Sequence, residues 1–216
     1  MDKQHPKMMH IAIEGGIGVG KTTLAQGLAS KLDANLLLES IEDNPFLELF
    51  YQHPERHGLS VQLSFLFSRL KQWQTLVQQD LFHPVMVSDY VFAKDRLFAM
   101  TNLSDAEFVL YEQVAQLVDI DLPRADLVIY LQSSPEIAFK RIQQRQRKFE
   151  KNITLDYINQ VTTTYDDFFF HYQDSPLLVV QTDRINFAEH PNALDMLIER
   201  INNMRSGTEF WSDYSD

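Results

Sequence analysis

A glycine-rich loop near the start of the chain is the segment best suited to chemistry. It follows an apolar run over residues 9–14 and contains the pattern Gly-x-x-x-x-Gly-Lys-Thr, from Gly15 to Thr22. Glycines let a backbone fold around phosphate with its N–H groups turned inward, and the positive end of a following helix adds to the attraction. The residues predicted to bind nucleotide are Gly15, Gly16, Ile17, Gly18, Val19, Gly20, Lys21, Thr22 and Thr23.

Two side chains at the end of this loop predict a nucleoside triphosphate and Mg²⁺ as ligands. Lys21 can reach the β- and γ-phosphates, and the Thr22 hydroxyl can bind Mg²⁺. An amphipathic segment over residues 24–32 follows the loop. The alternative is a glycine turn that merely connects a strand to a helix.

Two carboxylates fall where strands are predicted to end. Glu39 closes the apolar run 35–39, and Asp89 closes the run 84–89. Ligands of open parallel sheets lie beyond the carboxyl ends of the strands, so we expect both side chains near the γ-phosphate. Transfer to a hydroxyl needs one carboxylate to accept the proton and one to hold Mg²⁺. Either carboxylate could instead cap a helix.

Positive charge is concentrated in one short segment of an acidic chain. The net charge of −11 argues against a broad nucleic-acid surface. Arg141, Arg145, Arg147 and Lys148 nevertheless lie close together, which favours a small anionic ligand; the alternative is a solvated helix face. The chain has no cysteine, so disulfides, thiolate zinc sites and thiol catalysis are excluded.

Alternating strands and helices must position these groups. Buried-strand patterns cover residues 9–14, 35–39, 84–89, 126–131 and 177–181. They predict an α/β fold in which a five-stranded parallel sheet is flanked by helices on both faces. We expect one domain over residues 1–216, with an acidic C-terminal tail over about 206–216 that is loose or docked by its aromatic side chains.

Two amphipathic helices raise the question of a dimer. The first carries an apolar seam of Leu59, Leu63, Leu66, Leu70, Trp73 and Leu76, and the second runs from about Ser104 to Asp121. The seam could simply pack onto the sheet. Alternatively, the pair could meet its symmetry mate as a four-helix bundle and form a homodimer.

No segment has the apolar length of a membrane span, and residues 1–6 lack the apolar core of a signal peptide. We therefore expect a cytoplasmic enzyme without a membrane partner.

Three further runs of sequence resemble a known family. They are residues 39–51, from Glu39 to Tyr51; residues 61–69, from Val61 to Arg69; and residues 141–150, the arginine-rich segment. Together with the glycine loop, they resemble the deoxyribonucleoside kinases, and most closely the bacterial deoxyadenosine/deoxyguanosine kinase branch. The likeness runs in order from about Ile11 to Phe187 and implies a P-loop kinase fold with an Arg-rich lid over about 141–152.

The resemblance also implies roles for individual residues. Glu39 matches the general base that takes the proton of the nucleoside 5′-hydroxyl. The other matches are Tyr51 and Glu150 for the sugar 3′-hydroxyl, Gln62 and Arg69 for the base edge, Asp95 as the acidic partner of Arg69, and Arg141, Arg145 and Arg147 as lid arginines over the phosphates.

The chain departs from the family pattern after the third strand. The family has an acidic residue followed by Arg-Ser, whereas here Tyr90 and Val91 follow Asp89. Lys94 or Arg96 could supply the missing cation.

The expected function is ATP-dependent phosphorylation of a purine deoxynucleoside at its 5′-hydroxyl, for nucleotide salvage. One alternative is a nucleoside monophosphate kinase of the thymidylate type, although a carboxylate at position 39 would repel the phosphate of its acceptor. Another is a nucleotide-binding regulatory subunit with little turnover.

Overall fold

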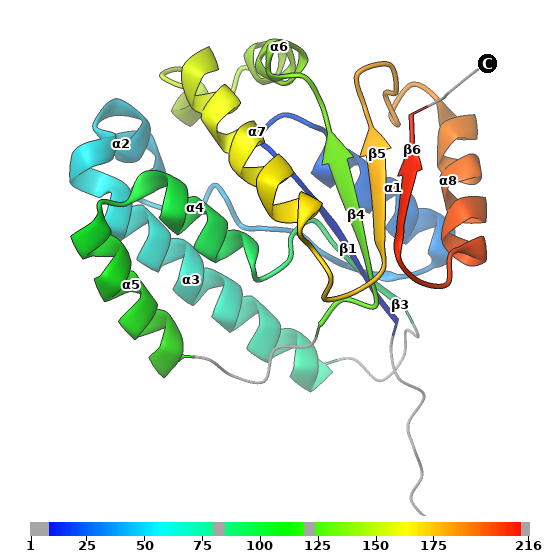
Figure 1. The fold of residues 1–216 in the computed structure, drawn as a ribbon, viewed down its shortest axis with the longest axis horizontal. Coiled ribbons are helices and arrows are strands. Elements are labelled where there is room, and N and C mark those ends of the chain that lie inside the picture. The colour runs from blue at the N-terminus through cyan, green and yellow to red at the C-terminus, as the bar shows by residue number, and fades with distance from the viewer. Residues whose placement is uncertain (1–8, 80–84, 119–123, 213–216) are drawn as a thin grey trace, which may run out of the picture.

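The computed structural model describes residues 9–79, 85–118 and 124–212. Its parallel strands form one sheet in the order β2-β3-β1-β4-β5-β6. The strands are β1 (Met9–Gly15), β2 (Asn35–Leu37), β3 (Val85–Ser88), β4 (Leu127–Gln132), β5 (Leu177–Gln181) and β6 (Thr208–Trp211). The central strand β1 leads into the glycine loop, so the loop opens at the middle of the carboxyl edge (Figure 1).

The prediction of five strands is wrong, because the segment expected to be a C-terminal tail supplies a sixth. Residues 208–211 pair in parallel with β5. Trp211 joins the main core, whereas Phe210 is exposed; this alternation is what a strand covered on one face produces. Residues 213–216 of the predicted tail lie outside the described residues.

Helices connect the strands and cover the sheet on both faces, as predicted. They are α1 (Lys21–Leu32), α2 (Leu47–Gln52), α3 (Pro54–Gln79), α4 (Lys94–Asn102), α5 (Asp105–Leu117), α6 (Pro135–Arg145), the short 3₁₀ helix η1 (Lys148–Glu150), α7 (Leu155–Phe170) and α8 (Pro191–Asn203). Of the predicted helix 104–121, residues 119–121 lie outside the described part of the chain. No helix within the described residues is long and apolar enough to cross a membrane.

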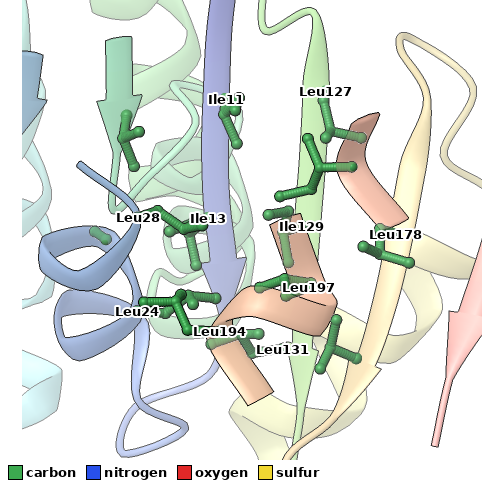
Figure 2. Packing of buried hydrophobic residues seen from close by; sticks show 14 of the residues in the cluster. Ile11, Ile13, Leu24, Leu28, Leu127, Ile129, Leu131, Leu178, Leu194 and Leu197 are labelled. Carbon is green, nitrogen blue, oxygen red and sulfur yellow. The ribbon is translucent and has the colours of Figure 1, made fainter. Parts of the chain in front are cut away.

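Alternate residues of the strands point into two separate cores. Ile11, Ile13 and Ile129 pack on one face against leucines of α1 and α8 (Figure 2). Ala12 and Tyr130 face the other way, toward α4 and α7. Because side chains alternate along a strand, a sheet covered on both faces requires the continuous apolar runs that the sequence shows.

Helices α3, α4 and α5 lie side by side (Figure 1). Leu66 and Leu70, from the predicted seam of α3, are buried against Ala99 of α4 and Tyr111 of α5. Trp73, further along α3, packs with Met86 and Tyr90 beside β3. This part of the seam is therefore used within the chain.

Candidate active site

The glycine loop is shaped by contacts that tolerate no side chain at two positions. Gly15 has φ 148°, and a Cβ there would lie 2.5 Å from the carbonyl oxygen of Leu131 in β4. Gly18 has φ 87°, and its Cβ would lie 2.5 Å from the carbonyl oxygen of Ala138 in α6. The glycines thus let the loop pack closely between β4 and α6.

Lys21 lies at the first position of α1, inside the loop. Its Nζ donates hydrogen bonds of 2.8 Å to the carbonyl oxygens of Gly15 and Gly16. Burial, together with repulsion from Lys94, lowers the pKa of Lys21 to about 8, although Glu14 and Glu39 oppose this shift. An anion in the loop would stabilise the charged ammonium group.

Asp89 links the loop to the end of β2. The hydroxyl of Thr22 donates to Asp89 Oδ2 over 2.7 Å, and the backbone N–H of Glu39 donates to Asp89 Oδ1, also over 2.7 Å. Carboxylate and hydroxyl oxygens are ligands that Mg²⁺ accepts, and Mg²⁺ is commonly bound by one or two such groups together with phosphates and water. Thr22 and Asp89 therefore fit the metal role predicted for them.

Glu39 is buried between two cations. Arg69 Nε donates to Glu39 Oε1 over 2.9 Å, with a second bond from its Nη2, and Lys94 Nζ donates to Glu39 Oε2 over 2.6 Å. Burial alone would raise the pKa of Glu39, but Lys94 and Arg69 outweigh it and hold that pKa at about 2. Glu39 is therefore ionised and fully engaged in this structure.

Arg69 has further contacts besides Glu39. Its Nη1 pairs with Asp95, which also accepts a hydrogen bond from the hydroxyl of Tyr111 in α5. The guanidinium also lies 5.1 Å from the ring centre of Phe65. These contacts fix the arginine in one orientation, with Asp95 as the acidic partner that the family resemblance implied.

A cavity of about 380 Å³ joins these groups. Its lining includes Gly18, Gly20, Lys21, Thr22, Thr23 and Ile17 of the loop, the charged side chains of Glu39, Arg69, Asp89, Lys94, Arg145, Arg147 and Glu150, and the side chains of Tyr51, Gln62, Phe65, Phe98, Asn102 and Tyr157. Gln62 is 2 % exposed, and its Oε1 has no hydrogen-bond partner. An unpaired buried acceptor at a cavity wall is suited to a ligand donor.

The end of α6 and the short helix η1 bring a cation and a carboxylate together at the cavity. Arg145 Nε donates to Glu150 Oε2 over 2.7 Å, and its Nη2 donates to Glu150 Oε1. Tyr51 lies nearby, and burial together with Tyr157 and Glu150 raises the pKa of its hydroxyl well above the usual value. Tyr51 is therefore a neutral hydroxyl beside an ionic pair, a group that can donate to a ligand oxygen.

Some predicted residues do not line the cavity. Three residues of the loop lie outside the lining of the cavity: Gly15, Gly16 and Val19. Asp95 also lies outside it and contacts the cavity through Arg69. Arg141 points elsewhere: its Nη2 donates to the carbonyl oxygen of Thr182 over 2.6 Å, next to the end of β5. In this structure Arg141 anchors backbone, whereas Arg145 and Arg147 face the cavity.

The structure also separates the two candidate cations. Lys94 is 5 % exposed and lines the cavity, whereas the side chain of Arg96 is 61 % exposed and pairs with Glu112 of α5. Lys94 is therefore the cation that lies at the site.

Sequence reasoning missed two contributors to the site. Glu14, the second-to-last residue of β1, is fully buried and accepts hydrogen bonds of 2.9 Å from the N–H groups of Gly15 and Val91. A charged residue inside an apolar strand was the available signal. Tyr157 of α7, whose hydroxyl donates to Asn102 over 3.1 Å, had no comparable signal, because only packing brings α7 to the cavity.

The phosphate loop, the hydrogen-bonded carboxylates of Glu39 and Asp89, and the cavity at the carboxyl edge of a parallel sheet define a P-loop phosphotransferase. The deoxynucleoside kinase family model matches residues 11–206, so the chain belongs to the deoxynucleoside kinase family and is an enzyme of that type.

Individual relatives agree with this assignment. The chain is 36% identical to a deoxyguanosine kinase of Bacillus subtilis over 158 residues, which is 72% of this chain and 76% of that protein. It is also 36% identical to a deoxyadenosine kinase of Dictyostelium discoideum over 162 residues, covering 74% of this chain and 66% of that one. Among solved structures, the deoxyadenosine kinase of M. mycoides with bound dCTP matches with a TM-score of 0.78 and 25% identity, over 91% of this chain and 100% of that one.

Proposed function

We propose that this kinase transfers the γ-phosphoryl group of ATP to the 5′-hydroxyl of a purine deoxynucleoside, with deoxyadenosine and deoxyguanosine as the favoured substrates. The observation that carries this proposal is the buried Glu39 in the same cavity as Lys21 and Thr22. The proposed preference for a purine substrate is supported by the relatives, which are named for deoxyguanosine and deoxyadenosine.

In the proposed reaction Glu39 accepts the proton of the 5′-hydroxyl while the hydroxyl oxygen bonds to the γ-phosphorus and the bond to ADP breaks. Lys21 and Arg145 offset the charge that spreads over the transferring group. Arg145 and Arg147 act as lid arginines over the phosphates, and Arg141 anchors α6, the helix that ends at Arg145. Thr22 and Asp89 would hold Mg²⁺, which would neutralise charge at the phosphates.

The nucleoside lies on the side of the cavity formed by α2, α3 and α7. Gln62 and Arg69 read the base edge, since an amide presents both a donor and an acceptor, and a guanidinium presents a rigid set of donors. Tyr51 and Glu150 bind the sugar 3′-hydroxyl. Arg145 leaves Glu150 for the phosphates as the substrates enter, and Glu150 then accepts a hydrogen bond from the sugar 3′-hydroxyl.

The two alternatives are weaker. A monophosphate kinase must hold an acceptor phosphate close to position 39, where the ionised Glu39 would repel it. A regulatory subunit with little turnover would be favoured by the lack of the family arginine at position 90. Tyr90 is buried, however, and its hydroxyl donates to Gln72, while Lys94 supplies a cation inside the cavity.

The enzyme acts as a homodimer in this proposal, with α3 and α5 contributing to a four-helix bundle. Support comes from large apolar side chains on these helices that stay exposed, among them Phe67, Leu110 and Leu117. Leu110 and Leu117 are seven residues apart and so share one face of α5. Sedimentation of the parent and of Leu110→Glu tests this: a dimer that becomes a monomer supports it, and a monomeric parent refutes it.

A substrate panel tests the proposed reaction. ATP is supplied with deoxyadenosine, deoxyguanosine, deoxycytidine, thymidine or dAMP, and the nucleotide products are measured. Lys21→Ala is the inactive control, since it removes charge at the phosphates and no core contact. Formation of dAMP or dGMP at the highest kcat/KM supports the proposal. Preferential phosphorylation of dAMP, or no product from any deoxynucleoside, refutes it.

A further inference from the structure

The ion pair between Glu39 and Lys94 presents a chemical difficulty for the reaction proposed above, on which this inference rests. Both oxygens of Glu39 are engaged, Oε1 by Arg69 and Oε2 by Lys94. A carboxylate held by two cations is a weak base, because the cations stabilise its charged form. Loss of one of these partners would make Glu39 a stronger base for the hydroxyl proton.

Arg69 is the partner that stays. Its Nη1 is paired with Asp95, its guanidinium lies against Phe65, and its side chain is 2 % exposed. Asp95 is in turn held by the hydroxyl of Tyr111. Removing Arg69 from Glu39 would require the whole α3–α4–α5 contact to change.

Lys94 is the partner that can leave. Its ammonium group is a point charge on a flexible four-carbon chain, so it can exchange one anion for another without a change of backbone. Among the residues that the structure describes, Lys94 forms an ion pair with Glu39 alone; Phe98, whose ring centre lies 5.7 Å from Nζ, is a neutral neighbour. Lys21 of α1 and Glu14 of β1 are charged groups close to Lys94.

The residues around Lys94 indicate where its ammonium group would move. Lys94 and Lys21 both line the cavity, so the same cavity carries two ammonium groups. Two cations that repel each other across one cavity form a good site for an anion of high charge. The path Thr22–Asp89–Glu39–Lys94 is also continuous, with hydrogen bonds at each step.

We propose that Lys94 is a further catalytic residue, which leaves Glu39 when the triphosphate binds, contacts the γ-phosphoryl group, and thereby frees Glu39 Oε2 to accept the proton of the nucleoside hydroxyl. In the step itself, the O5′–H bond breaks and its proton moves to Glu39. A bond forms between O5′ and the γ-phosphorus, and the bond from that phosphorus to the β,γ-bridging oxygen breaks, so ADP departs with the electron pair. Transfer of one lysine thus couples nucleotide binding to activation of the base.

A purely structural ion pair is the competing explanation, and binding of a triphosphate analogue separates the two. The probe is AMP-PNP with Mg²⁺, measured by calorimetry beside ADP with Mg²⁺, for the parent, Lys94→Met, Glu39→Gln and the double variant. If Lys94 moves to the γ-phosphoryl group, Lys94→Met weakens AMP-PNP binding about tenfold or more and ADP binding much less. Glu39→Gln strengthens AMP-PNP binding, because the lysine no longer has to leave a carboxylate.

AMP-PNP binding by the double variant distinguishes a direct phosphate contact of Lys94 from a structural role. A direct phosphate contact means that Lys94→Met still weakens AMP-PNP binding when Glu39 is already glutamine. If the effect of Lys94→Met disappears in that background, or if Glu39→Gln leaves AMP-PNP affinity unchanged, the lysine only positions Glu39 and the proposal is wrong. Circular dichroism of each variant checks that the fold is kept.

Turnover supplies the second readout. Lys94→Met is expected to lower kcat by about 10²-fold with the KM of deoxyadenosine changed only a few-fold, and Lys94→Arg to recover part of the loss. Arg96→Met is the matched control, because it removes a cation from the same helix outside the cavity, and its kcat should stay within about twofold of the parent. An inactive parent would refute the proposed function, while the AMP-PNP measurements would still decide the contact of Lys94.

Discussion

The hydroxyl of Thr22 donates a hydrogen bond to Asp89 Oδ2 over 2.7 Å, across 67 positions of sequence. This contact joins the first turn of α1 to the loop that follows β3. The other oxygen of Asp89 accepts from the backbone N–H of Glu39, so one carboxylate connects the phosphate loop to the proposed base. The proposed metal site and the proposed base therefore share one side chain, Asp89.

Asp89→Asn should impair Mg²⁺ binding more than it lowers the stability of the fold. The amide keeps the shape of the carboxylate but lacks its charge, so the half-saturating Mg²⁺ concentration should rise about tenfold or more. Activity measured against Mg²⁺ concentration checks this. Asp166→Asn is the control, since Asp166 accepts from Tyr130 and Gln132 away from the cavity; equal Mg²⁺ curves for all three proteins would contradict the metal role.

Glu39→Gln should slow the chemical step. Glutamine keeps the shape of the side chain but cannot take a proton, so kcat should fall by on the order of 10²–10⁴ with a modest change in KM. Single-turnover phosphorylation of deoxyadenosine and deoxyguanosine is the measurement. The control is Glu42→Gln, an exposed carboxylate three residues further on, and a slow Glu42 variant beside a fast Glu39 variant would move the base to Glu42.

Gln62→Ala should disturb base recognition while ATP binding stays nearly constant. The variant leaves a hydrogen-bonding group of the base buried without a partner, a loss of roughly 1–3 kcal/mol. The KM values of deoxyadenosine and deoxyguanosine should therefore rise, and their ratio should change. Gln113→Ala, at an exposed position of α5, provides the comparison; an unaltered substrate profile for Gln62→Ala would assign this side chain to structure.

His10 should make the fold sensitive to mild acid. Burial lowers the pKa of this imidazole to about 4, against the opposing charge of Asp126, so His10 is neutral in the fold while its unfolded pKa is about 6.5. Its contribution is complete above pH 6.5 and is lost as the pH falls from 6.5 toward 4, because the unfolded chain then binds the extra proton. The expected loss of unfolding free energy is about 3 kcal/mol.

Denaturant unfolding at several pH values checks the role of His10. His10→Gln keeps a group that can bond to Ser88, the partner of the imidazole over 2.8 Å, and should show a shallower dependence of stability on pH. His171→Gln, which removes an exposed imidazole, should keep the slope of the parent. A His10 variant with the parent's slope would show that this group does not titrate on unfolding.

Local patterns in the sequence determined the layers of the fold and the phosphate loop. Glycine spacing and the Lys-Thr pair define that loop through backbone sterics and charge alone, which act between near neighbours. Continuous apolar runs likewise predicted a parallel sheet covered on both faces. The sixth strand escaped this reasoning, because residues 208–211 carry a charge and an exposed Phe210, and only pairing with β5 makes them a strand.

Tertiary structure alone decided how the charges are shared. The sequence offered Lys94 and Arg96 as equal candidates two residues apart, but the start of α4 buries the first at Glu39 and leaves the second to Glu112 at the surface. It also grouped Arg141 with Arg145, although α6 turns Arg141 toward the backbone after β5. Lys94 and Arg96, two residues apart, lie on different faces of α4, whereas Arg141 and Arg145, four residues apart, share a face of α6 and differ in the partners they reach, Thr182 and Glu150. Which charge meets which partner therefore depends on the packing of segments far apart in the chain.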